Sequence, residues 1–444
     1  MRVLYTLLAT LALPFASLVV LWRGLRERAY WRGWSARFGG GAELPGEARG
    51  LWVHAVSVGE VQAATSLVTA LRKAWPALPL AVTSATPAGR ERARGAFAAD
   101  AAVDVRYAPY DLPWALRRAL RRLRPALLVV METELWPNLL HECAREGVPV
   151  LVASARVSAR SAARWSRFRG LLQPALGSAV TVAAQSAADA SRFTSLGVPA
   201  ERIHVCGNLK FDRTPGAAVR ERAQRLRARY AAARPMWVAG STHPGEESVA
   251  LESHAALRVT RGDALLVLAP RHRPRFDEVA RLLDASGLSW LRRSDTARDA
   301  ADAGGAAEAA GATASNAAVL LLDTIGELED FYAAADVAFV AGSLVPIGGH
   351  NLLEPAALGV ATLTGPCQHN APDIARLLGD AGGLQIVGNA AELGAALLRL
   401  LSDEAARARM AAAAQAAVAA NRGALAKILG LVSDLLASPP RPRL

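Results

Sequence analysis

The chain has 444 residues and a mass of 46.7 kDa, and 52% of its residues are hydrophobic, so it can form two folded domains and is neither disordered nor fibrous. Its three cysteines lie far apart, which argues against a disulfide framework or a zinc knuckle. The net charge of +12 is uneven, because residues 1–215 carry 28 Lys and Arg against 15 Asp and Glu, while the remainder carries 23 against 24. We therefore expect the first half to meet an anionic partner.

The first predicted element is an apolar helix. Residues 3–22 carry no charge, about the length that an α-helix needs to cross a bilayer core, and five arginines interleaved with aromatic side chains follow at 23–38. We expect residues 1–24 to be an uncleaved single-pass anchor, with the rest of the chain on the cytoplasmic side by the positive-inside rule. A helix that lies in one leaflet is the alternative, which Pro14 favours.

Short apolar runs then alternate with helical patterns, which predicts parallel sheets covered on both faces in an α/β fold. The strands expected in the first half are 51–58, 80–83, 103–107, 127–131, 148–153, 180–184 and 203–206, with a helix over 60–75. Those expected in the second half are 236–239, 265–269, 319–322, 337–340 and 361–363. We place two Rossmann-like domains at 25–214 and 215–444, facing each other across a cleft, and a solvated insertion at 295–316.

The chain lacks the short motifs that are typical of metal-dependent, dinucleotide-binding and ATP-binding enzymes. There is no DxD pair, no GxGxxG, no GxxxxGK[ST], no HExxH and no CxxC. We therefore expect neither a metal nor another cofactor, which leaves acid–base chemistry by side chains and anion binding by loops.

Acidic residues follow two predicted strands of the first half. Glu60 opens a helix after Ser57-Val58-Gly59, where it could act as a general base or simply cap the helix. Glu132 and Glu134 follow the strand at 127–131, and functional and structural roles are equally compatible with their position. His54, inside a strand, is expected to be a packed core histidine.

Arginines crowd two segments of the first half, 117–124 and 156–169. Because nearly all charges there have one sign, we expect these segments to meet anionic lipid headgroups or a phosphorylated lipid acceptor. Nucleic acid is not an expected partner, because the aromatic residues gather next to the apolar helix instead of among these arginines.

Four polar loops follow consecutive predicted strands of the second half, at 240–247, 269–276, 323–328 and 341–359. The segment that contains Gly348, Gly349 and Asn351 precedes an apolar helix and could expose backbone N–H groups to a phosphate. Glu354, one turn later, could hold a ribose diol. Together the loops predict a nucleotide-binding cleft.

Seven motifs together resemble a known family. AVSVGE, METELWPN, NLKFD, STHPGEE, PRHRPRF, DTIGEL and GGHNLLEP occur in that order behind the apolar helix, as in the 3-deoxy-D-manno-octulosonic acid (Kdo) transferases of lipopolysaccharide synthesis. The resemblance implies a GT-B fold and an inverting, metal-independent transfer of Kdo from CMP-Kdo. The implied acceptor is the phosphorylated lipid A precursor (lipid IVA), at the cytoplasmic face of an inner membrane with anionic lipids.

The same resemblance assigns roles to single residues. It implies that Glu60 is the general base and that Glu132 and Lys210 support the transition state. The positions that match the CMP-binding loops are Pro270, Arg271, Ile325, Gly326, Glu327, Asn351, Leu352, Leu353 and Glu354. The chain departs from the family pattern at Ile325, where Met is frequent, and in PRHRPRF. The alternatives are a membrane glycosyltransferase that uses another nucleotide sugar, such as a UDP-sugar, and a non-catalytic nucleotide-binding scaffold.

Overall fold

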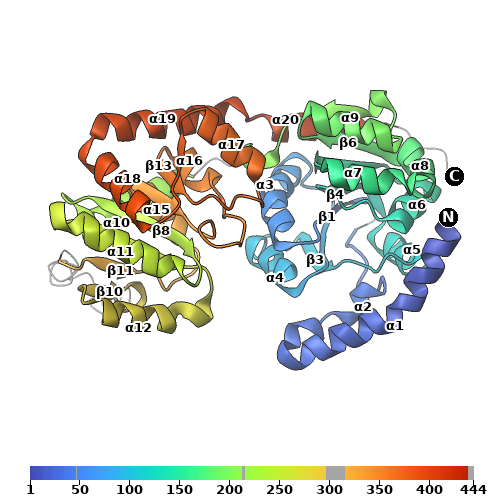
Figure 1. Ribbon diagram of the computed structural model, residues 1–444. Helices are drawn as coiled ribbons and strands as arrows, with labels where there is room; N and C mark the ends of the chain where they lie inside the picture. The colour runs from blue at the N-terminus through green and yellow to red at the C-terminus, as the bar shows by residue number, and fades with distance from the viewer. Residues whose placement is uncertain (47, 213–215, 297–315, 439–444) are drawn as a thin grey trace. The chain divides into compact units, whose positions relative to one another are not determined.

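The computed structural model describes residues 1–46, 48–212, 216–296 and 316–438, so most of the insertion expected at 295–316 lies outside the described residues. The chain divides into two compact units (Figure 1). Unit 1 holds Met1–Asp212 and the final segment from Asn421, and unit 2 holds Arg213–Ala420.

Unit 1 contains a seven-stranded parallel sheet in the order β3-β2-β1-β4-β5-β6-β7. Its strands are β1 Gly50–His54, β2 Leu80–Ser84, β3 Val103–Tyr107, β4 Pro125–Met131, β5 Val150–Ala155, β6 Val180–Ala184 and β7 Ile203–Val205. Its α-helices are α1 Arg2–Arg26, α2 Trp34–Arg37, α3 Val58–Ala74, α4 Pro87–Ala96, α5 Pro113–Leu123, α6 Pro137–Arg145, α7 Ala159–Ser166, α8 Arg169–Ala179, α9 Ala187–Leu196 and α20 Ala424–Ala437. Short 3₁₀ turns are η1 Arg28–Tyr30, η2 Ala200–Arg202 and η3 Leu209–Asp212.

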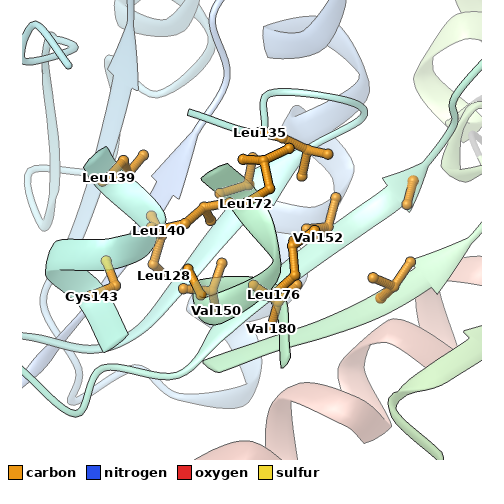
Figure 2. Packing of buried hydrophobic residues seen from close by; sticks show 14 of the residues in the cluster. Leu128, Leu135, Leu139, Leu140, Cys143, Val150, Val152, Leu172, Leu176 and Val180 are labelled. Carbon is orange, nitrogen blue, oxygen red and sulfur yellow. The ribbon is translucent and has the colours of Figure 1, made fainter. Parts of the chain in front are cut away.

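Two hydrophobic layers cover the faces of this sheet. Leu128 and Val130 of β4 belong to a cluster that includes residues of α6 and α8 (Figure 2). Leu127 and Val129 of the same strand belong to the opposite cluster, together with residues of α3 and α20. Because successive side chains of a strand point to opposite faces, a continuous apolar run is the sequence pattern that two covered faces require.

Unit 2 repeats this architecture with a parallel sheet in the order β10-β11-β9-β8-β12-β13-β14. Its strands are β8 Met236–Thr242, β9 Leu265–Pro270, β10 Trp290–Arg292, β11 Val319–Leu321, β12 Val337–Val340, β13 Ala361–Thr364 and β14 Leu384–Ile386. The helices with described bounds are α10 Ala217–Ala231, α11 Glu246–Thr260, α12 Phe276–Ser286, α15 Leu328–Ala334, α16 Leu353–Leu358, α17 Pro372–Asp380, α18 Ala390–Ser402 and α19 Glu404–Ala420, with a 3₁₀ turn η4 at Arg273–Arg275.

All twelve predicted strands are present, with ends that differ by a few residues. The largest difference is at β1, which ends at His54 instead of residue 58 because Ser57 caps a helix that already begins at Val58. Two strands were not predicted, β10 and β14. Each is three residues long and lies at an edge of the sheet, where the pattern is too short to separate from a loop.

The end of the chain differs from the predicted division, which assigned residues 215–444 to the second domain. Helix α20 buries Ile428, Val432 and Leu435 in the core of unit 1. The Asp212 carboxylate accepts hydrogen bonds from the backbone N–H groups of Gly423 and Leu425 at 2.6 and 2.7 Å, which holds the start of this helix. The chain therefore returns to unit 1 after residue 420, because the apolar face of α20 completes that core.

Helix α1 exposes one apolar face along its whole length. The exposed large side chains are Val3, Leu4, Leu7, Leu8, Leu11, Phe15, Leu18, Leu21, Trp22 and Leu25. By length and composition α1 could anchor in a membrane or serve as a signal. A second apolar stretch of the described chain, Glu404–Ala437, passes the same test, but its C-terminal part is the core helix α20.

We expect Ile428→Ala to lower the free energy of unfolding of unit 1 by about 2–5 kcal/mol, because removal of this buried side chain leaves a cavity between α20 and the sheet. Urea unfolding, with hydrogen exchange to assign the loss to unit 1, measures this. Lys427→Ala, an exposed position on the same helix, is the control and should change stability by less than about 0.5 kcal/mol. Equal stability of the two variants would contradict the assignment of α20 to the core of unit 1.

Candidate functional site

Glu60 lies at the carboxyl end of β1, in the first turn of α3, and is only 8% exposed. Its two carboxylate oxygens accept hydrogen bonds from the backbone N–H of Val56 at 2.8 Å and from the hydroxyl of Ser57 at 2.9 Å. The Ser57 hydroxyl oxygen in turn accepts from the Glu60 N–H at 3.3 Å. Ser57 therefore caps the helix, and the bonds from Val56 and Ser57 hold the Glu60 carboxylate in place in an arrangement that resembles a capping box.

Burial raises the pKa of Glu60 to about 7, with smaller contributions in the same direction from the negative charges of Glu134 and Glu132. The hydrogen bonds from Val56 and Ser57 favour the ionised form and limit the rise. Near neutral pH the protonated and ionised forms of this carboxyl group are therefore both populated, which suits a group that takes up and releases protons.

Lys210 and Glu132 come together beside this position. The Lys210 ammonium lies 2.8 Å from a Glu132 carboxylate oxygen, although the two residues are 78 positions apart. Glu132 follows β4, the neighbour of β1 in the sheet, and has a left-handed backbone with φ of 54°. Such a conformation is uncommon for a side chain other than glycine or asparagine, and it is held here by the Glu132 N–H bond to Ala153 of the adjacent strand.

An aromatic contact supports the same loop. The Trp136 indole N–H donates to the Glu134 carboxylate at 2.7 Å, and the ring meets His54 edge-on at 4.7 Å between centroids. His54 is fully buried, and burial lowers its pKa to about 4, so it is neutral. The prediction of a packed core histidine is confirmed, whereas the support from Trp136 was not foreseen.

The arginines predicted to form an anion-binding face on α5 are largely used within unit 1. Arg117 forms a bidentate pair with the fully buried Glu142 at 2.9 and 3.1 Å. Arg122 donates to the carbonyl of Gly41, and Arg124 donates to that of Leu44. These three side chains are held by contacts within unit 1, and the contact of this segment with an anionic lipid or acceptor stays a prediction.

In unit 2 a buried carboxylate joins two of the predicted loops. Glu246, fully buried at the start of α11, accepts four backbone N–H bonds of 2.7–3.0 Å, from His243 in its own loop and from Gly342, Ser343 and Leu344 after β12. This carboxylate fixes the loops after β8 and β12 relative to each other.

Three histidines gather at the same edge of the sheet in unit 2. The Nε2 atoms of His243 and His350 lie 2.9 Å apart with the rings stacked, and His272 meets His243 edge-on at 5.4 Å between centroids. Burial and the positive charge of Arg271 lower the pKa of His350 to about 4. The pair is therefore neutral at physiological pH, with one ring donating to the other.

The residues expected to bind a nucleotide follow β9, β11 and β12, whose carboxyl ends share one edge of the sheet. Arg271 and Ile325 are exposed there. The Glu327 carboxylate is held by Arg293 at 2.6 Å and by the Thr324 hydroxyl, and these contacts outweigh burial and lower its pKa.

The last predicted loop, at 341–359, contains both exposed and buried residues. Gly348 and Gly349 have φ of 105° and 77°, and a side chain at Gly349 would collide with Gln368, so this turn requires glycine. The Asn351 amide donates to the Glu354 carboxylate at 3.2 Å. Leu352 and Leu353 are buried, and the predicted Pro270 ends β9, so these three side chains pack within the loops, and their contact with a nucleotide stays a prediction.

Sequence reasoning missed Glu246 and His243 as parts of this loop arrangement. The spacing from His243 to Glu246 is that of a capping box, which could have indicated the local N–H bond. The three bonds to residues 342–344 connect positions almost 100 residues apart and have no local signal.

A family profile described as "3-Deoxy-D-manno-octulosonic-acid transferase (kdotransferase)" matches residues 32–213. The 3-deoxy-D-manno-octulosonic acid transferase of Haemophilus influenzae is 36% identical over 98% of this chain and 99% of its own. That of Bordetella pertussis is 38% identical over 96% of this chain and 98% of its own. UDP-GlcNAc 2-epimerase from Neisseria meningitidis, bound to UDP-GlcNAc, is 12% identical with a TM-score of 0.55 over 87% of this chain and 98% of its own, a likeness that shows the two-unit GT-B-like fold.

We expect Glu246→Gln to destabilise unit 2 by about 2–3 kcal/mol, because one of its oxygens becomes an amide donor that faces backbone N–H donors. Urea unfolding measures the loss, and hydrogen exchange at 240–247 and 341–349 locates it. Glu252→Gln, on the exposed side of the same helix, should behave as the unmodified chain. Unchanged protection of both loops in Glu246→Gln would contradict this role.

Proposed function

This chain belongs to the 3-deoxy-D-manno-octulosonic acid transferases, and from that membership we propose that it transfers Kdo from CMP-Kdo to the phosphorylated lipid A precursor with inversion and without a metal. The observation that carries the proposed mechanism is the buried Glu60 carboxyl group, whose pKa is raised to about 7 next to the Lys210–Glu132 pair. We assign Glu60 as the general base.

The base acts on the acceptor. As a glucosamine hydroxyl attacks the anomeric carbon of Kdo, the O–H proton passes to Glu60, the new glycosidic C–O bond forms, and the bond to the CMP phosphate oxygen breaks. Val56 and Ser57 hold the carboxylate in one position, so no reorganisation is needed at the moment of transfer. The Lys210 ammonium adds a positive charge at the same sheet edge, and Glu132 orients it.

We assign the donor to unit 2. The departing CMP carries a phosphate, and the exposed Arg271 guanidinium, which follows β9, offers a positive charge to it. Glu246 keeps the loops after β8 and β12 in a fixed arrangement. The sequence has no DxD motif, so side chains and backbone would stabilise the leaving group without a divalent ion.

The direct test is incubation of the purified chain with CMP-Kdo and the tetraacylated lipid A precursor, followed by mass spectrometry of the lipid. We expect the mass of at least one Kdo to be added, at the same rate in EDTA. Calorimetry with CMP and with UDP separates this donor from a UDP-sugar. Turnover with a UDP-sugar alone, or nucleotide binding without turnover on any lipid, would contradict the proposal.

We also propose that α1 attaches the chain to the cytoplasmic face of the inner membrane as a helix within one leaflet. Three contacts of its first turns support this: Tyr5 donates to Asp111 at 2.8 Å, Thr6 donates to Asn138 at 3.0 Å, and Arg2 lies 3.9 Å from Glu142. If α1 spanned the bilayer, these residues would be separated from the body of unit 1 by about 30 Å of hydrocarbon. The leaflet alternative therefore has more support than the spanning anchor.

We expect Glu60→Gln to reduce the transfer rate by at least about 10²–10⁴-fold, because an amide cannot accept the proton. The affinity for CMP should stay nearly unchanged in calorimetry, since the nucleotide is assigned to unit 2. Glu201→Gln, an exposed change in the same unit, should keep full activity. Full activity of Glu60→Gln would refute the assignment of the base.

The transfer rate should fall about tenfold per pH unit below about pH 7, where Glu60 becomes protonated. In Glu134→Gln a neighbouring negative charge is lost, ionisation of Glu60 becomes easier, and this acidic limb should move to lower pH. The amide oxygen of the substituted side chain could still accept the Trp136 bond, so the fold is preserved. A limb that does not move would show that another group sets the pH profile.

The position of α1 can be measured with a fluorophore on cysteines that replace Leu4, Leu11 or Leu18, which share its exposed face. In vesicles that contain lipids with quenchers at known depths, a helix in one leaflet predicts similar depths for all three. A spanning helix predicts that the middle position is much the deepest.

A further inference from the structure

Unit 1 contains a basic pocket at the carboxyl ends of β2 and β3, outside the Glu60 region. Its volume is about 350 Å³, and its lining includes Arg32, Arg90, Arg94 and Tyr107. Glu91, an exposed residue, is the one carboxylate in the lining. Arg90 and Arg94 lie one turn apart on α4, and Arg32 comes from the segment that follows α1, so the lining draws its positive charge from two segments of the chain.

A fourth arginine lies buried next to this pocket. Arg37 is 4% exposed, and its guanidinium carbon lies 3.9 Å from the centre of the Tyr107 ring. Its Nη1 donates to the carbonyl of Ala85 at 3.1 Å, but its Nε and Nη2 are buried without a hydrogen-bond partner. The Arg90 guanidinium lies 4.7 Å from the same ring, and its Nε is also buried without a partner.

No ion pair among the described residues neutralises Arg37 or Arg90. A buried guanidinium without a carboxylate costs free energy, because water is lost and nothing replaces it. Burial, together with the positive charges of Arg94 and Arg37, lowers the pKa of Arg90, which is the direction expected when like charges are left uncompensated. Contact with the Tyr107 ring offsets only part of this cost. An anion would supply both the missing acceptors and the missing charge.

The pocket is close to the proposed base along the same sheet edge. Arg37 binds the carbonyl of Ala85, the Ala85 N–H donates to the carbonyl of Val56 at 3.1 Å, and the Val56 N–H donates to Glu60. On its other side, the Tyr107 hydroxyl donates to the carbonyl of Ala29 at 2.9 Å, in the segment that follows α1. The pocket lining therefore reaches the segment that follows α1 through Ala29, and Arg37, next to the lining, is connected to the loop that holds the proposed base.

We propose that this pocket binds a phosphate monoester, and that in the transfer reaction the monoester is a phosphate group of the lipid acceptor. This assignment rests on the proposed function and adds a positioning site to it. A monoester has three terminal oxygens and close to two negative charges, which suits several guanidinium forks better than a single carboxylate does. The acyl chains of the same lipid would then lie along the exposed face of α1.

Binding can be tested without turnover. Inorganic phosphate, compared with chloride at equal ionic strength, should raise the thermal unfolding midpoint of the full chain. Arg90→Gln should abolish this rise, while Arg92→Gln, on the same helix but outside the pocket lining, should retain it. Arg37→Met, which removes a buried charge next to the lining, should weaken the rise, and it should not lower the midpoint without phosphate, because a buried unpaired charge is removed. An equal phosphate response in Arg90→Gln and Arg92→Gln would overturn the site.

Transfer to matched acceptors identifies the source of the phosphate. With the bisphosphorylated lipid, Arg90→Gln should raise KM by about tenfold or more and leave kcat little changed, as expected for loss of a charged hydrogen bond. With the monophosphorylated lipid that lacks the phosphate bound in this pocket, and with the phosphate-free lipid, Arg90→Gln and the unmodified chain should have the same KM. If Arg90→Gln loses the phosphate response but keeps its KM for every acceptor, the site binds free phosphate and the acceptor assignment is wrong. If no acceptor is turned over at all, the proposed function fails while the binding result still stands.

Discussion

Burial of the Glu60 carboxyl group at the end of β1 sets its protonation behaviour, on which the proposed mechanism depends. In water a glutamate is fully ionised at neutral pH and takes up protons weakly, whereas the buried side chain has a pKa of about 7. The Val56 N–H and the Ser57 hydroxyl stabilise the ionised form and limit the rise in pKa, and the Ser57 hydroxyl oxygen also caps α3. The sequence presented capping and catalysis as alternatives, but the hydrogen bonds between Ser57 and Glu60 at the helix start are compatible with the proposed catalytic role.

The parallel sheets were predictable because a strand that is buried on both faces needs apolar residues at every position, and this gives a short apolar run in the sequence. Strands such as β3 and β12 match their predicted ranges, whereas β10 and β14 are three-residue edge strands with too few buried positions to give a pattern. The return of α20 to unit 1 could not be predicted, since an amphipathic helix shows that it has an apolar face but not which core that face completes.

The sequence could suggest single candidate residues for the site, but it could not suggest the contacts between them. Glu60 and Glu132 follow apolar runs, and this position alone marks them as candidates; Lys210 was assigned only through the family motif. Pairings such as Lys210 with Glu132, or Glu246 with residues 342–344, depend on strand order, which a single sequence does not contain. For the same reason, clustering along the chain did not show which arginines are paired. Arg117 is paired with Glu142 and Arg122 donates to a carbonyl group, whereas Arg37 and Arg90 are far apart in sequence and share one ring.

The unpaired arginines and the exposed face of α1 are explained together if the ligand is an amphiphile. Each feature alone is unfavourable in water. The arginines leave buried positive charge uncompensated, and α1 leaves apolar side chains exposed. The segment after α1 joins them, since Ala29 binds Tyr107 and Arg32 lines the pocket. A headgroup phosphate in the pocket and acyl chains against α1 would satisfy both, and would leave the sugar between them within reach of the sheet edge that carries Glu60. A soluble nucleotide could neutralise the arginines but could not cover the apolar face of α1. The two features together therefore favour a lipid acceptor over a second nucleotide in unit 1.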